Sequence, residues 1–182
     1  DCRQRQEIGA GVRIITDTET TGLALTSSAW VELEGGVPVC KLRLQARADS
    51  DAWLVLALRP ANPEGISFIH QVSLSPGRDA WTVDDAQRVE FSRAAERHHI
   101  SDYRHGDVFI HLQDRDDQTA GLCDVGMVTA AALFPVKAGE VAEITASIPL
   151  AAAAPLAADA WDTAQRNRCQ LDCPDPQYQF LY

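Results

Sequence analysis

The sequence has no apolar run long enough to cross a membrane. Its longest one, from Ile148 to Ala158, is interrupted by Pro149 and Pro155 and reaches about half of the roughly 20 residues that a membrane-spanning helix needs. Cationic residues are also scarce: 16 Lys and Arg stand against 26 Asp and Glu, which gives a formal net charge of -10. Nucleic acids and anionic membranes are bound mainly through cationic side chains. We therefore expect neither nucleic acid nor membrane as a partner.

Sequence motifs of several common enzyme classes are absent as well. The chain has no Gly-x-Ser-x-Gly nucleophile elbow, no P-loop and no dinucleotide-binding fingerprint. Glycoside hydrolysis needs two facing carboxylates, and nothing in the sequence singles out such a pair. We therefore expect no catalytic residue and no cofactor in this chain.

The cysteines do not form a disulfide pattern. They are odd in number and widely scattered, in a chain too large to need disulfide bonds for its stability. Cys169 and Cys173 are separated by three residues instead of two, which supports neither redox chemistry of the thioredoxin type nor a zinc knuckle. We interpret these two as incidental thiols and expect a cytoplasmic protein. The five are Cys2, Cys40, Cys123, Cys169 and Cys173.

Short apolar runs separated by turn residues dominate the chain up to about Leu150. The runs are rich in Val, Ile, Leu, Trp and Phe, and clusters of Gly, Pro, Asn or Asp divide them. This pattern predicts an all-β fold, a large antiparallel β-sandwich of about ten strands in residues 1–150. The predicted strands are Val12–Thr16, Ala29–Glu34, Val37–Ala46, Trp53–Leu58, Ile66–Leu74, Ala80–Val83, Arg88–Phe91, Val108–Leu112, Leu122–Phe134 and Glu140–Ile148.

Three of these runs allow finer predictions. Val37–Ala46 alternates between apolar and polar residues, with a slip near Cys40 that indicates a bulge. Trp53–Leu58 is continuously apolar and Ile66–Leu74 alternates, so we expect them to be neighbouring central strands.

After Pro149 the composition changes. Ala151–Ala158 and the residues up to Arg166 have high helix propensity and almost no β-branched side chains. The aromatic cluster Tyr178–Tyr182 is interpreted as the first turn of a further helix. We expect residues 151–182 to form a short helical linker.

A family resemblance adds to this interpretation. The run Leu56–Ile69, with the sequence LALRPANPEGISFI, resembles a stretch in the N-terminal supersandwich-like domain of bacterial glycogen-debranching and glucoamylase-like (amylo-α-1,6-glucosidase-related) glycoside hydrolases. The tail Gln177–Tyr182 looks like the entry to their α/α barrel. The resemblance implies a non-catalytic accessory domain that packs on a C-terminal catalytic barrel of the same polypeptide and helps to shape its cleft. It also implies an α-glucan oligosaccharide as a candidate ligand.

The candidate contact residues come mainly from this motif. Arg59, Asn62 and Glu64 are expected to form either a structural corner or a contact with carbohydrate or with the catalytic domain. Trp81 is the fourth candidate contact. The tryptophans as a group either pack in the core or form a sugar-stacking platform, as in an independent carbohydrate-binding module. They are Trp30, Trp53, Trp81 and Trp161.

Other polar clusters have a simpler interpretation beside a functional one. The run His98–Asp107 supplies imidazoles and carboxylates for a small metal-dependent enzyme, but its irregular spacing favours a solvated loop and no metal. His70 and His111 lie in strand patterns, where a lone histidine is usually structural. The acidic run Asp114–Asp117, with Asp124 after it, lacks the pattern of a calcium loop and indicates a solvated hairpin tip.

Overall fold

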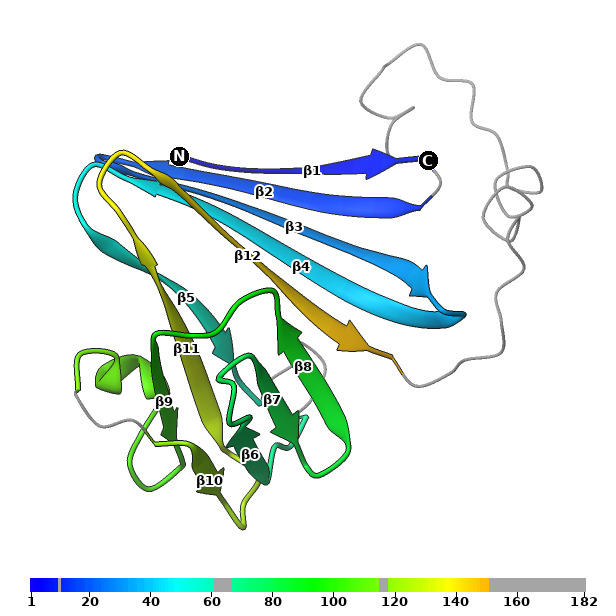
Figure 1. Ribbon diagram of the computed structural model, residues 1–182, viewed down its shortest axis with the longest axis vertical. Coiled ribbons are helices and arrows are strands. Elements are labelled where there is room, and N and C mark those ends of the chain that lie inside the picture. Colours follow the sequence, from blue (N-terminus) through cyan, green and yellow to red (C-terminus); the bar gives the residue numbers. More distant parts are fainter. Residues whose placement is uncertain (10, 61–66, 115–117, 151–182) are drawn as a thin grey trace. The chain divides into compact units, whose positions relative to one another are not determined.

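The computed structural model describes residues 1–9, 11–60, 67–114 and 118–150 of the 182-residue chain. These residues form an all-β, sandwich-like fold in which every strand pairs antiparallel with its neighbours, as predicted (Figure 1). The predicted helical linker 151–182 lies outside the described residues. The elements are β1 (Cys2–Ile8), β2 (Val12–Thr20), β3 (Leu23–Glu34), β4 (Val37–Ala48), β5 (Ala52–Leu58), β6 (Gln71–Leu74), β7 (Ala80–Val83), β8 (Gln87–Phe91), β9 (Arg97–Ser101), the 3-10 helix η1 (Val108–His111), β10 (Ala120–Leu122), β11 (Thr129–Val136) and β12 (Val141–Pro149).

The strands form one long sheet and one short one. The nine-stranded sheet has the order β1-β2-β3-β4-β12-β8-β7-β6-β10, and the three-stranded sheet has the order β5-β11-β9. The first four strands are a meander, after which the chain crosses to the short sheet (Figure 1). β12 returns to the long sheet and pairs with both β4 and β8.

The main core lies between the short sheet and the part of the long sheet that runs from β4 through β12, β8 and β7 to β6. Leu54 and Phe134 contribute from the short sheet, and Ile144, Trp81 and Val72 contribute from the long sheet. All of them are buried, and the side chains of Phe134, Ile144 and Val72 have no solvent exposure. Two layers with an apolar interior are what the alternation of apolar residues predicts.

The opposite face of the short sheet is covered by η1. Val108 of this helix packs with Ala131 and Leu133 of β11. The sequence prediction of a strand over Val108–Leu112 is therefore wrong. The side chain of Asp107 accepts a hydrogen bond from the backbone N–H of Phe109 and caps the helix, which local β propensity does not reveal.

Two strands that were expected to be neighbours lie in different sheets. β5 pairs with β11 of the short sheet, and β6 pairs with β7 and β10 of the long one. β6 also begins only at Gln71. The prediction for Trp53–Leu58 and Ile66–Leu74 was wrong because two adjacent apolar runs in a sequence can face each other across the core as well as pair side by side.

The β3–β4 hairpin is continuous. Its register runs without interruption from Leu23 opposite Ala48 to Glu34 opposite Val37, so the bulge expected near Cys40 is absent from this hairpin. Gly35 and Gly36 both have positive φ, at 58° and 85°, which is the conformation that a two-residue hairpin turn requires. The apparent slip arises because Val39 and Lys41 are both buried on the polar face of the sheet.

The strands differ from the predicted ones in three other places. β1 was not predicted, because Cys2–Ile8 is largely polar and exposed along its whole length. β9 was not predicted because its two histidines indicated a loop. The expected strand Leu122–Phe134 is two strands, since a turn with a positive φ at Gly126 separates β10 from β11.

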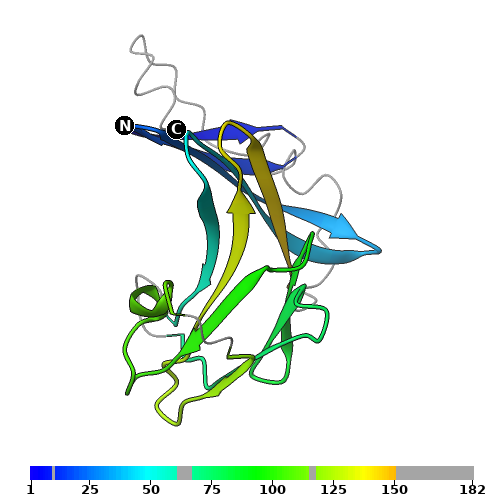
Figure 2. The same cartoon turned by 60° about the vertical axis from the view of Figure 1, so that its left-hand side comes forward.

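β1, β2 and β3 extend beyond the two-layer region. They form the end of the long sheet that the short sheet does not cover (Figure 2). Among the described residues, none from these strands belongs to either core cluster. This part of the fold is therefore a single layer of sheet.

Candidate functional site

The register of the strands brings several loops together at one end of the sheets. Leu58 lies opposite Ala130, and Ser101 lies opposite Thr129, so the residues after β5, after β9 and before β11 are neighbours. The backbone N–H of Cys123 donates to the carbonyl of His70, which adds the segments before β6 and after β10. We call this region the loop end.

Arg59 lies at the loop end and pairs there with a carboxylate. Its Nη2 atom donates to Asp107 Oδ1 at 2.7 Å, and both side chains are about half exposed. The same carboxylate oxygen caps η1, so Arg59 connects the end of β5 to this helix. Asn62 and Glu64, the other candidates from the motif, lie outside the described residues.

Trp81 does not lie at the surface. Its side chain is 1% exposed, and its ring packs edge-on against Phe91 at a centroid distance of 4.7 Å. Its Nε1–H donates to Nε2 of His98 at 2.6 Å. A ring in this position packs the core and presents no face to a sugar or to a neighbouring domain, which corrects the expected contact role.

Each of the other tryptophans within the described ranges has a guanidinium over its ring. The guanidinium of Arg13 lies 4.4 Å from the ring centroid of Trp30, and that of Arg97 lies 5.5 Å from the ring of Trp53. The sugar-stacking platform proposed for the four tryptophans therefore does not assemble from these three. Trp161 lies outside the described residues.

The polar run His98–Asp107 divides into a buried part and an exposed part. His98 and His99 are buried in β9, so the solvated loop that was predicted here begins only after Ser101. In that loop Asp102 Oδ1 accepts hydrogen bonds from the backbone N–H groups of Arg104 and His105, and from His105 Nδ1 at 2.8 Å. The carboxylate thus orders a tight turn. Within the described ranges no three His, Cys, Asp or Glu side chains are placed to hold a metal ion.

Neither His70 nor His111 lies in a strand, although both were predicted to do so. His70 lies before β6, where its ring is tilted against that of Phe68. His111 ends η1, and its Nδ1 contacts Asp114 Oδ2 at 2.7 Å while its Nε2 contacts the carbonyl of His105 at 3.0 Å. Both ring nitrogens face acceptors, first the Asp114 carboxylate and then this carbonyl, which raises the pKa of His111 above its ordinary value.

Asp114→Asn is expected to move the pKa of His111 back toward its ordinary value near 6.5. Because the folded pKa is raised, the contribution of this contact to stability is complete below pH 6.5 and is lost as the pH rises through the folded pKa. An NMR titration of the His111 imidazole measures the change, with Asp124→Asn as the control. Equal midpoints in the parent and Asp114→Asn proteins would contradict the assignment.

The acidic run at Asp114 is only partly described, since residues 115–117 lie outside the described ranges. Asp114 itself pairs with His111. Its backbone carbonyl also accepts a hydrogen bond from Arg97 Nη2. These contacts anchor the residues after η1 to β9.

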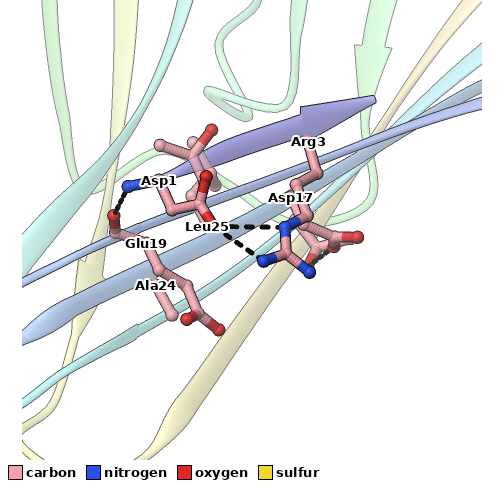
Figure 3. Close-up of a pocket in the computed structure, with 8 residues that line it drawn as sticks. Asp1, Arg3, Asp17, Glu19, Ala24 and Leu25 are labelled. Atoms are coloured by element: carbon pink, nitrogen blue, oxygen red, sulfur yellow. Dashed lines mark hydrogen bonds and ion pairs between the residues drawn. The ribbon is translucent and has the colours of Figure 1, made fainter. Parts of the chain in front are cut away.

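A hollow lies on the first three strands of the long sheet, at its β1 edge (Figure 3). Its volume is about 300 Å³, and its lining includes three acidic residues and Arg3. The Thr26 hydroxyl and then Arg5 donate to Asp17, and these hydrogen bonds lower the pKa of its carboxyl. The carboxylate is thus held in its charged, paired form, which does not suit a general acid. The lining residues are Asp1, Arg3, Asp17, Thr18, Glu19, Ala24, Leu25 and Thr26.

The loop end has an unusual concentration of exposed apolar side chains. They are between 48% and 72% exposed, and they lie in or beside the segments that form this end of the sheets. Sequence reasoning did not find them, because most of them lie in loops and short elements without periodicity. The one available signal was Asp107, a favoured helix-capping residue before an apolar run. The side chains are Phe68, Tyr103, Phe109, Ile110, Leu122 and Val125.

Within the described ranges, no helix has the length and apolar character that crossing a bilayer requires. Comparison with models of known protein families and with curated proteins gave no match.

Proposed function

We propose that the chain is a non-catalytic accessory domain of an α-glucan-acting glycoside hydrolase and packs on a catalytic barrel of the same polypeptide. The observation that carries the proposal is the loop-end patch, defined as Phe68, Tyr103, Phe109, Ile110, Leu122 and Val125. Large exposed apolar patches on soluble domains mark surfaces that contact another body. The hydrolase assignment rests on the resemblance of the run Leu56–Ile69, which leads directly from β5 into this end.

The polar groups at the loop end support docking better than catalysis. The Asp107 carboxylate is paired with Arg59, and that of Asp102 is engaged by backbone and imidazole donors. Charged groups held by partners within a domain suit the polar rim of an interface, and exposed apolar side chains suit its centre. The predicted contact role of Arg59 fits this arrangement.

The proposed compartment is the cytoplasm. Cys2, Cys40 and Cys123 are free thiols. Free cysteines persist where the environment is reducing.

The test uses the full-length natural polypeptide and measures the release of reducing ends from maltooligosaccharides. Replacing Tyr103 and Phe109 together by serine is expected to weaken docking and to lower activity about tenfold, since central apolar contacts typically contribute more than 1 kcal/mol each. Val141→Ser, at a 65% exposed position on β12, is the control and should leave activity unchanged.

Two results would count against this proposal. A full-length polypeptide that releases no sugar from α-glucans contradicts the hydrolase assignment. An active polypeptide that tolerates the Tyr103 and Phe109 substitutions contradicts the loop-end patch as the docking surface.

An independent carbohydrate-binding module is the second candidate, because three exposed members of the patch, Phe68, Tyr103 and Phe109, are aromatic. Aromatic faces stack on the apolar side of sugar rings. Calorimetric titration of the 182-residue chain with maltoheptaose separates the two candidates. We expect no binding heat from a scaffold, whereas a binding module would give heat that Tyr103→Ala removes.

A further inference from the structure

The single-layer part of the long sheet has two chemically different faces. Register places Ile14 opposite Ala29 and Leu25 opposite Ala46, which puts these residues on one face with Leu44 and Ile144 of the core. Across β1, β2 and β3, this face carries no Asp, Glu, Lys or Arg. We call it the uncharged face. Its large apolar side chains are Ile8, Ile14, Leu23, Leu25, Val31 and Leu33.

The opposite face of these strands and of the adjoining β4 carries the charged side chains, and many of them contact one another or an aromatic ring. Arg5 contacts Asp17, Lys41 contacts both Glu32 and Glu34, and Arg13 stacks on Trp30. An antiparallel sheet with one polar, solvated face normally has its other face covered. The uncharged face is thus the side that requires a second layer.

Burial shows that this layer is missing within the described part of the chain. The six large apolar side chains of the uncharged face are between 37% and 63% exposed. The short sheet packs on the long sheet only from β4 onward, so the apolar surface continues from the core directly onto β3, β2 and β1. Apolar surface of this extent on a soluble domain drives association.

We infer that the uncharged face binds the same face of a second copy, forming a symmetric dimer in which each copy supplies the layer that the other lacks. A two-fold interface requires a surface that complements itself. An apolar face without charges meets this requirement even though each chain carries a net charge of -10, because no like charges are brought together there.

The size of the face agrees with a specific dimer. Three strands spaced about 4.8 Å apart, with about nine residues each at about 3.4 Å, give roughly 440 Å² of flat area per copy. Two such faces bury about 900 Å² of flat area, which places the contact at the weak end of specific protein–protein interfaces. The dimer is expected to dissociate in the micromolar range. It uses a surface separate from the loop-end patch and is independent of the proposed function.

Sedimentation equilibrium of the 182-residue chain over a range of concentrations tests the dimer. We expect the mass to rise from 19.9 kDa toward twice that value. Leu25→Glu and Val31→Glu, made separately, are expected to raise the dissociation constant at least ~100-fold, because each places a charge on both sides of an apolar interface. Val141→Glu adds the same charge at a more exposed apolar position on the polar face and should leave the dimer intact.

The outcomes separate this proposal from its alternatives. Circular dichroism first establishes that each variant is folded, and two separate positions guard against one of them failing to fold. A chain that stays monomeric at every concentration overturns the proposal. A dimer that withstands both glutamate substitutions also overturns it, since that dimer uses another surface. Loss of the dimer, with unchanged α-glucan hydrolysis when the same substitutions are made in the full-length polypeptide, separates this result from the proposed function.

Discussion

Phe134→Ala is expected to lower the free energy of unfolding by about 3–5 kcal/mol, which is the usual cost of deleting a fully buried aromatic ring. Phe134 is on β11 and has no solvent exposure. Its ring meets Phe91 of the long sheet edge-on at a centroid distance of 6.0 Å, and the guanidinium of Arg93 lies 5.4 Å from its centroid. The substitution therefore leaves a cavity between the two sheets.

Chemical denaturation at a fixed protein concentration measures this loss. Phe109→Ala is the matched control, because the Phe109 side chain is 67% exposed and its removal should cost less than about 0.5 kcal/mol. If the two substitutions destabilise the protein equally, the two-layer packing described here is wrong.

The hydrogen bond between Trp81 and His98 is expected to show strong coupling in a double-mutant cycle. The indole N–H can only donate, so Nε2 of His98 accepts and the proton lies on Nδ1, which faces the carbonyl of Gln118 at 2.7 Å. His98→Leu removes the acceptor from a buried indole and is expected to cost about 2–3 kcal/mol. Trp81→Phe is expected to cost about 1–3 kcal/mol, because it removes the donor and part of a packed ring.

The double variant should be less destabilised than the sum of the single variants by about 1–2 kcal/mol, because it leaves neither partner unsatisfied. Denaturation of the four proteins under one set of conditions gives the coupling energy. Strict additivity would mean that this buried contact adds nothing to stability beyond the packing of each side chain.

The sequence was most informative where alternation and turn chemistry agree. β7 was predicted with its observed bounds, and the turn at Gly35 and Gly36 falls between the predicted strands Ala29–Glu34 and Val37–Ala46. Elements whose stability depends on distant partners were missed. The histidines of β9 look solvated in the sequence, whereas the indole of Trp81 across the core and the carbonyl of Gln118 provide contacts for the buried His98 ring.

The candidate site could be predicted only in part, for the same reason. Arg59 stood out through its motif, but Asp107, which holds it, lies 48 residues away in the sequence. Trp81 was predicted as a contact because exposed and buried tryptophans have the same local pattern in a short strand. The loop-end patch depends on the register of β5, β9 and β11, which no local pattern encodes.

The chemistry of β1 limits how this protein can assemble. A border strand has free amide and carbonyl groups along one side, to which strands of other molecules can add without limit. Arg3, Arg5 and Glu7 alternate along β1. If two such strands overlapped fully in opposite directions, the two Arg5 side chains would stand directly across from each other, which is unfavourable, while each Arg3 would stand across from Glu7 of the other copy. A foreign strand without this matching pattern of charges finds no such compensation, so the alternating charges of β1 restrict which strands can add at this border.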